Sequence, residues 1–325
     1  YDPDLYTVYG AYTSANNIDS GEYFSTSHTM GDVCILEYYQ PREIDFIPII
    51  SLHEVIHDYK DIMNFHNTED ESDRCYTNVV CSQGDPYEDQ INSASWLDMG
   101  GYICSGAMIN NTRNDKTPYY LTADHCTTGE YPGTFRFYFN YETSSCTGSW
   151  ANYGSYVYGS QMKANASDTD FSLLEISGTV YDSWNVFYAG WSRNNPSMMS
   201  VSVGVHHPGG DPKKINFHNS GNAYTNGWDV WGTHWRLSWE EGGTEGGSSG
   251  SPFFDNNGRI IGQLTGGSGE ACDGGWDYYG KFSESWDYGS TSSSRLRDWL
   301  DPDNTGIMNL DGIYDVMVMG CTDPN

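Results

Sequence analysis

The chain has 325 residues, of which 37% are hydrophobic, so it can bury one large core or two smaller ones. Its 44 Asp and Glu against 15 Lys and Arg give a formal net charge of −29. Such a field repels phosphate backbones and anionic headgroups, which argues against nucleic-acid and lipid partners, and it attracts cationic substrates. The acidity is also typical of a secreted protein that only needs to stay soluble.

Aromatic residues make up 15% of the chain and Gly is frequent, which favours strands and turns over helices. Eight cysteines with no Cys-x-x-Cys pair indicate disulfides formed in an oxidising compartment. The longest apolar run, 46–52, is too short to cross a bilayer. The sequence begins Tyr1-Asp2-Pro3 without a signal peptide, which indicates a secreted chain already processed after export.

The first part of the chain has little regular pattern. Residues 33–39 predict one strand, stopped by Pro41, and the polar, acidic residues 64–74 predict a linker. We therefore expect residues 1–74 to form a small N-terminal segment that contains some strand.

Residues 53–57 spell His-Glu-x-x-His, the pattern of zinc hydrolases. On a helix, His53 and His57 would share one face and Glu54 would activate a metal-bound water, with His66 or Glu69 as a third ligand. The β-branched residues around the motif suit a strand at least as well, and a strand would hold the two imidazoles too far apart. A zinc hydrolase therefore stays the alternative interpretation.

Residues 242–254 carry the strongest chemical pattern, a run rich in Gly and Ser that ends in Pro-Phe-Phe. Ser249 is the candidate nucleophile, with the N–H groups of Gly247 and Ser249 facing the oxyanion and Gly250 allowing a sharp bend. A flexible linker would have the same composition. However, the run continues through a turn at 256–258 into an apolar strand at 259–264, which predicts a hairpin.

Two further segments supply the partners that a serine nucleophile needs. Strands at 102–110 and 119–126 place His125 at a strand end, and Asp170 stands at the start of another strand that runs to residue 176. A base that takes the serine proton needs its other ring nitrogen held by a carboxylate. His125 and Asp170 can provide this pair.

The segments 121–126, 170–174 and 247–252 resemble the three catalytic blocks of chymotrypsin-like serine proteases, and the likeness is nearest to secreted bacterial lysyl endopeptidases. It covers residues 75–312 and includes the shorter blocks 75–81, 189–191, 205–208, 262–267 and 294–302. The resemblance implies an all-β fold of two antiparallel β-barrels with a C-terminal helix. It also implies a catalytic triad of His125, Asp170 and Ser249 in the cleft between the barrels.

The resemblance also implies where the side chain before the scissile bond binds. The family's acidic pocket residue matches Asp277, with Asp273 as a rival, and Thr244 matches a pocket-lining position. A buried carboxylate is needed because an unpaired buried cation is too costly. Cleavage after Lys is expected, with Arg as a second option.

Three positions bear on how far the family pattern extends. In lysyl endopeptidases a histidine stacks between the catalytic histidine and a tryptophan that lies near the substrate. Trp191 matches this tryptophan. Thr265 replaces that stacking histidine in this chain. Ser248 precedes the nucleophile where trypsin-like enzymes carry an Asp that pairs with a newly cut N-terminus, a departure that lysyl endopeptidases share.

The resemblance suggests three disulfides and leaves two cysteines for a fourth. The pairs are Cys75–Cys272, Cys81–Cys146, Cys104–Cys126 and, by the remainder, Cys34–Cys321. The last would tie residues 1–74 to the tail 313–325 that follows the protease domain.

We therefore expect a secreted serine endopeptidase, extracellular or at a bacterial cell surface, that acts on polypeptides containing Lys or Arg. No cofactor and no metal is expected, although the acidic segment after Asp301 weakly resembles a calcium loop. A binding module that keeps the protease fold without catalysis remains a third interpretation.

Overall fold

The structure is a computed structural model that describes residues 1–4, 8–13, 26, 29, 31–45, 49–56, 75–148, 151, 155–196, 198–199, 202–221, 223–268 and 274–314. It divides into two compact units, Tyr1–His57 and Asp58–Asn325. The second unit carries all of the strands and helices of the described residues.

Seven strands form the first sheet of the second unit: β2 (Ala94–Asp98), β3 (Ile103–Met108), β4 (Tyr119–Ala123), β5 (Arg136–Phe139), β6 (Ser155–Tyr158), β7 (Ser160–Ala166) and β8 (Phe171–Ile176). Their order is β6-β5-β2-β3-β4-β8-β7, and all neighbours are antiparallel. β2 to β5 and β8 are almost entirely buried and rich in aromatic and aliphatic residues, which suits strands packed on both faces.

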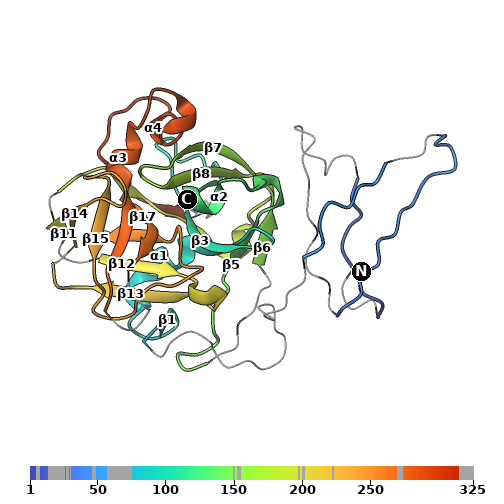
Figure 1. Cartoon of the computed structure of the whole chain (residues 1–325), viewed down its shortest axis with the longest axis horizontal. Coiled ribbons are helices and arrows are strands. Elements are labelled where there is room, and N and C mark those ends of the chain that lie inside the picture. The colour runs from blue at the N-terminus through green and yellow to red at the C-terminus, as the bar shows by residue number, and fades with distance from the viewer. Residues whose placement is uncertain are drawn as a thin grey trace, which may run out of the picture. The chain divides into compact units, whose positions relative to one another are not determined.

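Eleven strands form the second sheet: β1 (Thr77–Asn78), β10 (Trp191–Ser192), β11 (Met198–Met199), β12 (Ser202–His206), β13 (Lys214–His218), β14 (Ala223–Asn226), β15 (His234–Leu237), β16 (Pro252–Asp255), β17 (Ile260–Gly267), β18 (Asp277–Lys281) and β19 (Asn309–Leu310). The main path runs β1-β13-β12-β16-β17-β18-β15-β14-β11. The predicted hairpin is present as β16 and β17. Figure 1 shows the two curled sheets side by side, the second in yellow and orange.

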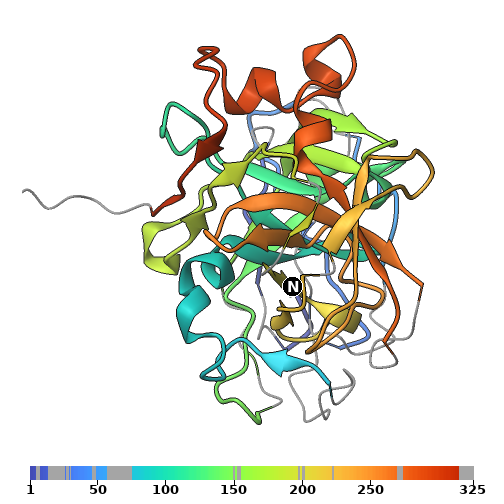
Figure 2. The same ribbon diagram turned by 90° about the vertical axis from the view of Figure 1, so that its left-hand side faces the viewer.

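Short elements close the ends of the sheets. A two-stranded sheet pairs β9 (Phe187–Tyr188) with β20 (Ile313–Tyr314), so ordered structure continues past the expected domain end at residue 312. The helices are α1 (Glu88–Ser93), α2 (Asp124–Thr127), α3 (Phe282–Trp286) and α4 (Arg297–Leu300). Short 3-10 turns lie at Asp85–Tyr87, Pro132–Thr134, Asp182–Trp184, Pro208–Gly210 and Ser292–Ser294. The orange-red helical end appears at the top of Figure 2.

One hydrophobic cluster joins the two sheets. It includes Leu121 and Phe171 from the first sheet and Val205, Phe254 and Ile260 from the second. Removing this apolar surface from water stabilises the contact between the sheets by roughly 25 cal/mol per Å² buried. The same hydrophobic core therefore supports the site residues at the ends of both sheets.

The expectation of a mostly β protein with two antiparallel, curled sheets is confirmed, with the parallel pairing of β10 and β17 as a local exception. The expected C-terminal helix is present only as the single short turn α4. Among the described residues, no helix is long and apolar enough to span a bilayer.

The strand predicted at residues 33–39 does not form. The N–H of Ile35 and the N-terminal amine of Tyr1 each donate to the other residue's carbonyl, but no ladder continues from this pair, and much of the segment is exposed. The predicted Cys34–Cys321 disulfide is also contradicted, because Cys34 is an exposed free thiol. Cys321 itself lies outside the described residues. An apolar pattern forms a strand only where another strand supplies partners.

Gly280 in β18 tests the fit between the two sheets. A Cβ added there would lie 1.9 Å from the Thr169 carbonyl oxygen and 2.3 Å from Gln263 Nε2. We expect Gly280→Ala to lower the free energy of unfolding by about 1–3 kcal/mol, because the backbone of the other sheet has to move. Gly101→Ala is the matched control, since nothing lies within 4 Å of its added Cβ. Urea titrations that show equal stability for both variants would contradict the close approach.

Candidate active site

His125 is held at the junction between β4 and β8. β4 ends at Ala123, and the short helix α2 turns the chain so that His125 is exposed while Asp124 is buried. The Cys104–Cys126 disulfide ties α2 to β3. Asn165 Nδ2 donates to Asp124 Oδ1 over 2.6 Å and fixes the start of the helix. The imidazole thus projects from a restrained turn and not from the predicted strand end.

Asp170 meets His125 through both carboxylate oxygens. The His125 backbone N–H donates to Oδ1 over 2.9 Å, and Nδ1 lies 2.8 Å from Oδ2. Asp170 adopts a left-handed conformation with φ of +51° at the end of the turn before β8, a conformation that Asp tolerates better than most residues. Gln263 Nε2 from the second sheet donates to the Asp170 backbone carbonyl, so the second sheet helps to hold the residue that carries this carboxylate.

The charge of Asp170 changes the protonation of His125. Partial burial of the ring lowers its pKa, but the hydrogen bond and negative charge of Asp170, with a smaller effect from Asp124, outweigh burial and leave the pKa raised. Because the carboxylate accepts from Nδ1, the neutral ring carries its proton there and leaves Nε2 as the basic nitrogen. The site therefore holds a base that faces away from its carboxylate.

The loop that carries Ser249 packs against the strands beside His125. The Ser105 N–H in β3 donates to the Ser249 carbonyl over 2.7 Å, and Gly250 N–H donates to the Leu264 carbonyl over 2.7 Å. Gly250 has a φ of +79°, and a Cβ there would lie 2.1 Å from Thr122 Oγ1. Only glycine allows this approach to β4. Ser249 is thereby brought next to the strand that ends just before His125.

Ser249 Oγ makes no hydrogen bond to His125 among the described residues. Such contacts are often long in unliganded enzymes and tighten when substrate binds. The structure thus brings His125 and Asp170 into direct contact and fixes the Ser249 backbone beside them.

The backbone around Ser249 offers unused donors. Within residues 242–251, the N–H groups of Ser248, Gly250 and Ser251 donate to carbonyl oxygens. Those of Gly247 and Ser249, like those of residues 242, 244 and 246, donate to no described residue. Gly247 has a φ of +93°, and Ser105 Oγ donates to its carbonyl over 2.9 Å. Two neighbouring free N–H groups are what an oxyanion requires.

A buried carboxylate lies on the strand next to this loop. Asp277 at the start of β18 is 7% exposed and accepts a hydrogen bond from Thr244 Oγ1 over 2.8 Å and one from Trp239 Nε1 over 2.7 Å. Burial raises the pKa of Asp277 to about 6, although these two donors favour the charged form. The structure therefore brings the predicted pair Asp277 and Thr244 together. Trp239 was missed, since no local motif marks it.

The expectation that Trp191 lies at the substrate is wrong. Its side chain has 0% exposure, donates from Nε1 to the Asn110 carbonyl over 2.9 Å and packs against Phe282 and Trp286. Pairing of β10 with β17 and β19 places the indole in the core. Thr265 shares a 3.0 Å hydrogen bond with Nε2 of a different histidine, His234.

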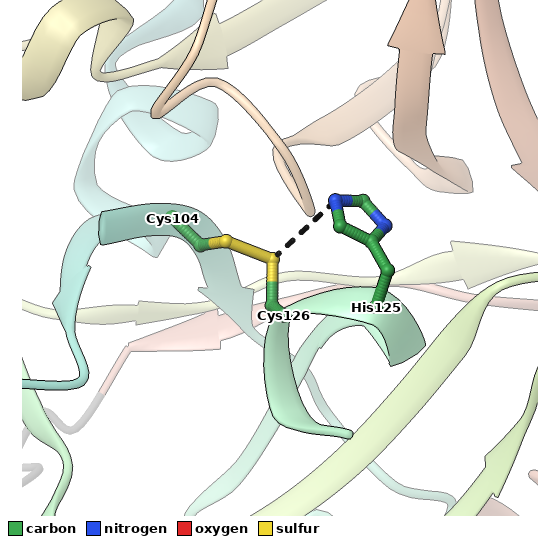
Figure 3. A group of neighbouring side chains, drawn as sticks. All are labelled: Cys104, His125 and Cys126. Atoms are coloured by element: carbon green, nitrogen blue, oxygen red, sulfur yellow. Dashed lines mark hydrogen bonds between the residues drawn. A yellow bond between two sulfur atoms is a disulfide. The ribbon is translucent and has the colours of Figure 1, made fainter. Parts of the chain in front are cut away.

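One group of potential metal ligands lies in the site, formed by Cys104, His125 and Cys126 (Figure 3). His125 Nε2 lies 3.9 Å from Cys126 Sγ. Both sulfurs belong to the Cys104–Cys126 disulfide and offer no thiolate, the form that binds metals. This group does not fit a metal centre.

The alternative zinc motif and the weak resemblance to a calcium loop also gain no support. Residues 51–56 form neither helix nor strand, so His53 and Glu54 lack the helix that the zinc motif requires; His57, His66 and Glu69 lie outside the described residues. The Asp301 carboxylate already accepts hydrogen bonds from Thr112, Thr305 and the Gly306 N–H. The Asp301 carboxylate is thus engaged by its own loop and by Thr112.

The cysteine pairing agrees with the family pattern where it is described. The structure contains the Cys81–Cys146 and Cys104–Cys126 disulfides. Cys75 is disulfide-bonded, while its predicted partner Cys272 and the rival pocket residue Asp273 lie outside the described residues.

The pKa of His125 tests the pair with Asp170 directly. Asp170→Asn removes the negative charge that stabilises the protonated ring of His125. We therefore expect the His125 pKa to fall in this variant. Titration of the ring protons by NMR measures this change. An unchanged pKa would show that the contact does not persist in solution.

The comparisons with known proteins agree with one another. The family model "Lysyl endopeptidase, C-terminal domain" matches residues 69–280. A lysyl endopeptidase of Pseudomonas aeruginosa is 29% identical over 212 residues, which cover 60% of this chain and 45% of the relative. The chain thus spans less than half the length of this relative.

Two solved structures are also similar. A Glu endopeptidase is 16% identical, with 63% of this chain and 91% of that chain covered and a TM-score of 0.44. A thermostable serine protease from an extremophilic microorganism is 14% identical, with 59% and 92% covered and a TM-score of 0.45. Because these scores are low, the assignment depends on the family match: the chain belongs to the lysyl endopeptidase family of chymotrypsin-like serine endopeptidases.

Proposed function

We propose that this chain hydrolyses peptide bonds on the carboxyl side of Lys, and of Arg to a lesser extent, through His125, Asp170 and Ser249. The observation that carries the proposal is the two-point bond between His125 and Asp170 beside the Ser249 loop. The family match supports the reaction class.

The geometry supports the following chemistry. Ser249 Oγ attacks the peptide carbonyl while His125 Nε2 takes its proton, and the resulting imidazolium is stabilised by Asp170. The N–H groups of Gly247 and Ser249 bind the oxyanion. When the C–N bond breaks, His125 returns the proton to the leaving amine. Water then attacks the acyl-enzyme in the same way, and Ser249 is released.

Asp277 supports the choice of a cationic side chain. Its carboxylate is buried but is held by Thr244 and Trp239, so an ammonium group that enters the pocket finds an oriented partner. Burial alone makes the ionised carboxylate unfavourable, and a substrate cation compensates for that cost. The overall charge of −29 further attracts basic polypeptides.

We also propose that the protein works outside the cell. Disulfides persist in oxidising compartments, and the described residues contain two complete ones besides the bonded Cys75. The role of residues 1–74 is proposed to be that of a pre-catalytic or accessory segment.

Ser249→Ala tests the reaction class. We expect kcat on peptides to fall about 10⁶-fold, because no other group can form the acyl-enzyme. Ser283→Ala in α3 serves as the control with unchanged kcat. A serine-directed phosphonylating reagent should add one group to the wild type and none to Ser249→Ala, as read by intact mass. Labelling of both, or a chelator that abolishes activity, would overturn the assignment.

Asp277→Asn tests the specificity. On a mixed peptide library we expect kcat/KM after Lys to fall about 10²–10³-fold, because the substrate cation loses its partner. The phosphonylating reagent should still react with Ser249. Asp255→Asn is a matched control, since among the described residues that buried carboxylate accepts only from the N–H groups of Asn257 and Arg259 in its own turn. Unchanged cleavage after Lys would assign the pocket to another residue.

The raised pKa of Asp277 predicts a pH dependence of cation binding. An alkylamine stays protonated below about pH 10, so below pH 7 only the enzyme titrates. With a pKa of about 6, Asp277 becomes charged as pH rises, and affinity for butylamine should increase from pH 5 and level off above pH 6. Asp277→Asn should remove this increase in competition assays. A pH-independent affinity would contradict the buried carboxylate.

A further inference from the structure

The loop that carries the nucleophile rests on a buried histidine that the triad does not use. His206 at the end of β12 is 1% exposed. Its Nδ1 lies 2.7 Å from Ser248 Oγ, and its Nε2 lies 3.1 Å from Asn216 Oδ1. Ser248 directly precedes the nucleophile, so this contact acts on the backbone between Gly247 and Ser249.

The donors and acceptors among Asn216, His206 and Ser248 can be assigned by starting from the side-chain amide of Asn216. Asn216 Nδ2 donates to the Gly243 carbonyl over 2.5 Å, so the amide oxygen faces His206. An oxygen accepts only, so His206 carries its proton on Nε2 and Nδ1 accepts from the Ser248 hydroxyl. Ser248 Oγ in turn accepts the Glu245 N–H over 3.2 Å. The hydrogen bonds therefore run without interruption from Gly243 to Glu245 through the protein interior.

Burial keeps this imidazole neutral. It lowers the pKa of His206 to about 3, with a smaller lowering from the charge of Lys214 and an opposing effect of the Asn216 hydrogen bond. A protonated ring would present an N–H to Ser248 and lose the acceptor. The neutral tautomer is thus the one that the loop requires.

The turn after β12 holds the same loop through its backbone. The Gly209 N–H donates to the Gly246 carbonyl over 2.7 Å. The His207 N–H donates to Ser105 Oγ over 2.9 Å, and Ser105 Oγ donates to the Gly247 carbonyl over 2.9 Å. The turn and Ser105 therefore hold residues 246 and 247, and His206 in β12 holds residue 248. The N–H groups of Gly247 and Ser249 between these contacts donate to no described residue.

We propose that His206 is a positioning residue, which with Asn216 and Ser248 orients the two N–H groups of the oxyanion site. In this chain the hydrogen-bonded group of neutral side chains takes the place of an ion pair between an Asp before the nucleophile and a cut N-terminus. This inference rests on the proposed function, because it concerns the same site. A positioning role acts mainly on the tetrahedral state and not on binding in the Asp277 pocket.

His206→Phe is the principal test, since it keeps a ring and removes both hydrogen bonds. We expect kcat on a lysyl peptide amide to fall about 10²-fold, the scale of losing one oxyanion donor, while KM changes less than about threefold. The affinity for a lysine peptide aldehyde, which forms a tetrahedral adduct with Ser249, should fall by a similar factor. The affinity for butylamine, which only fills the pocket, should stay unchanged.

Two further variants separate positioning from stability. His206→Gln can accept from Ser248 and donate to Asn216, so it should recover most of kcat. His218→Phe removes another fully buried histidine, whose Nδ1 lies 3.3 Å from the Ser238 carbonyl in the same sheet, and should leave kcat unchanged. If His206→Phe fails to fold, Ser248→Ala removes the same contact with a smaller change and should show the same loss of kcat and aldehyde affinity.

The outcomes distinguish this inference from the function on which it depends. Wild-type cleavage after Lys together with unchanged kcat in His206→Phe or Ser248→Ala would overturn the positioning role alone. Equal losses of aldehyde and butylamine affinity would also overturn it, because they would indicate general collapse of the site. A wild type that neither cleaves peptides nor binds the aldehyde would overturn the proposed function itself.

Discussion

The site depends on the contact between Asp170 and His125. Two bonds, one to the backbone N–H and one to Nδ1, fix the position of the imidazole and the location of its proton. The Asp170 backbone that carries this carboxylate is held by its left-handed turn and by the Gln263 amide of the other sheet, which donates to the Asp170 backbone carbonyl. The packing of the two sheets therefore helps to determine the orientation of the His125 ring and the location of its proton on Nδ1.

Contacts between neutral groups stabilise the nucleophile loop. Gly247 and Gly250 have positive φ, which glycine adopts readily. The loop is held by neutral groups: Ser105, the backbone of the turn after β12, and the buried chain through His206. Neutral hydrogen bonds avoid the desolvation cost of a buried ion pair, and they do not need a free amino terminus.

A carboxylate is buried at Asp277, where we propose that a substrate cation binds. Asp277 is buried among donors that orient it, and burial raises its pKa toward the neutral range. Under the proposed function, a lysine side chain would compensate for the cost of this buried charge. The net charge of −29 favours the approach of basic polypeptides, and under the proposed function Asp277 would select among their side chains.

The sequence by itself determined the strands around the site, the hairpin of β16 and β17, and the family to which the chain belongs, because short-range patterns and local blocks carry that information. It also identified His125, Asp170, Thr244 and Asp277 as candidates. Only the tertiary structure decided that Trp191 is a core residue, that residues 33–39 form no strand and that Cys34 is free. The tertiary structure also revealed His206 under Ser248 and Trp239 on Asp277, pairs separated by 42 and 38 residues. The burial of a side chain and the identity of its hydrogen-bond partner depend on segments that meet only after folding. A local sequence pattern therefore cannot predict them.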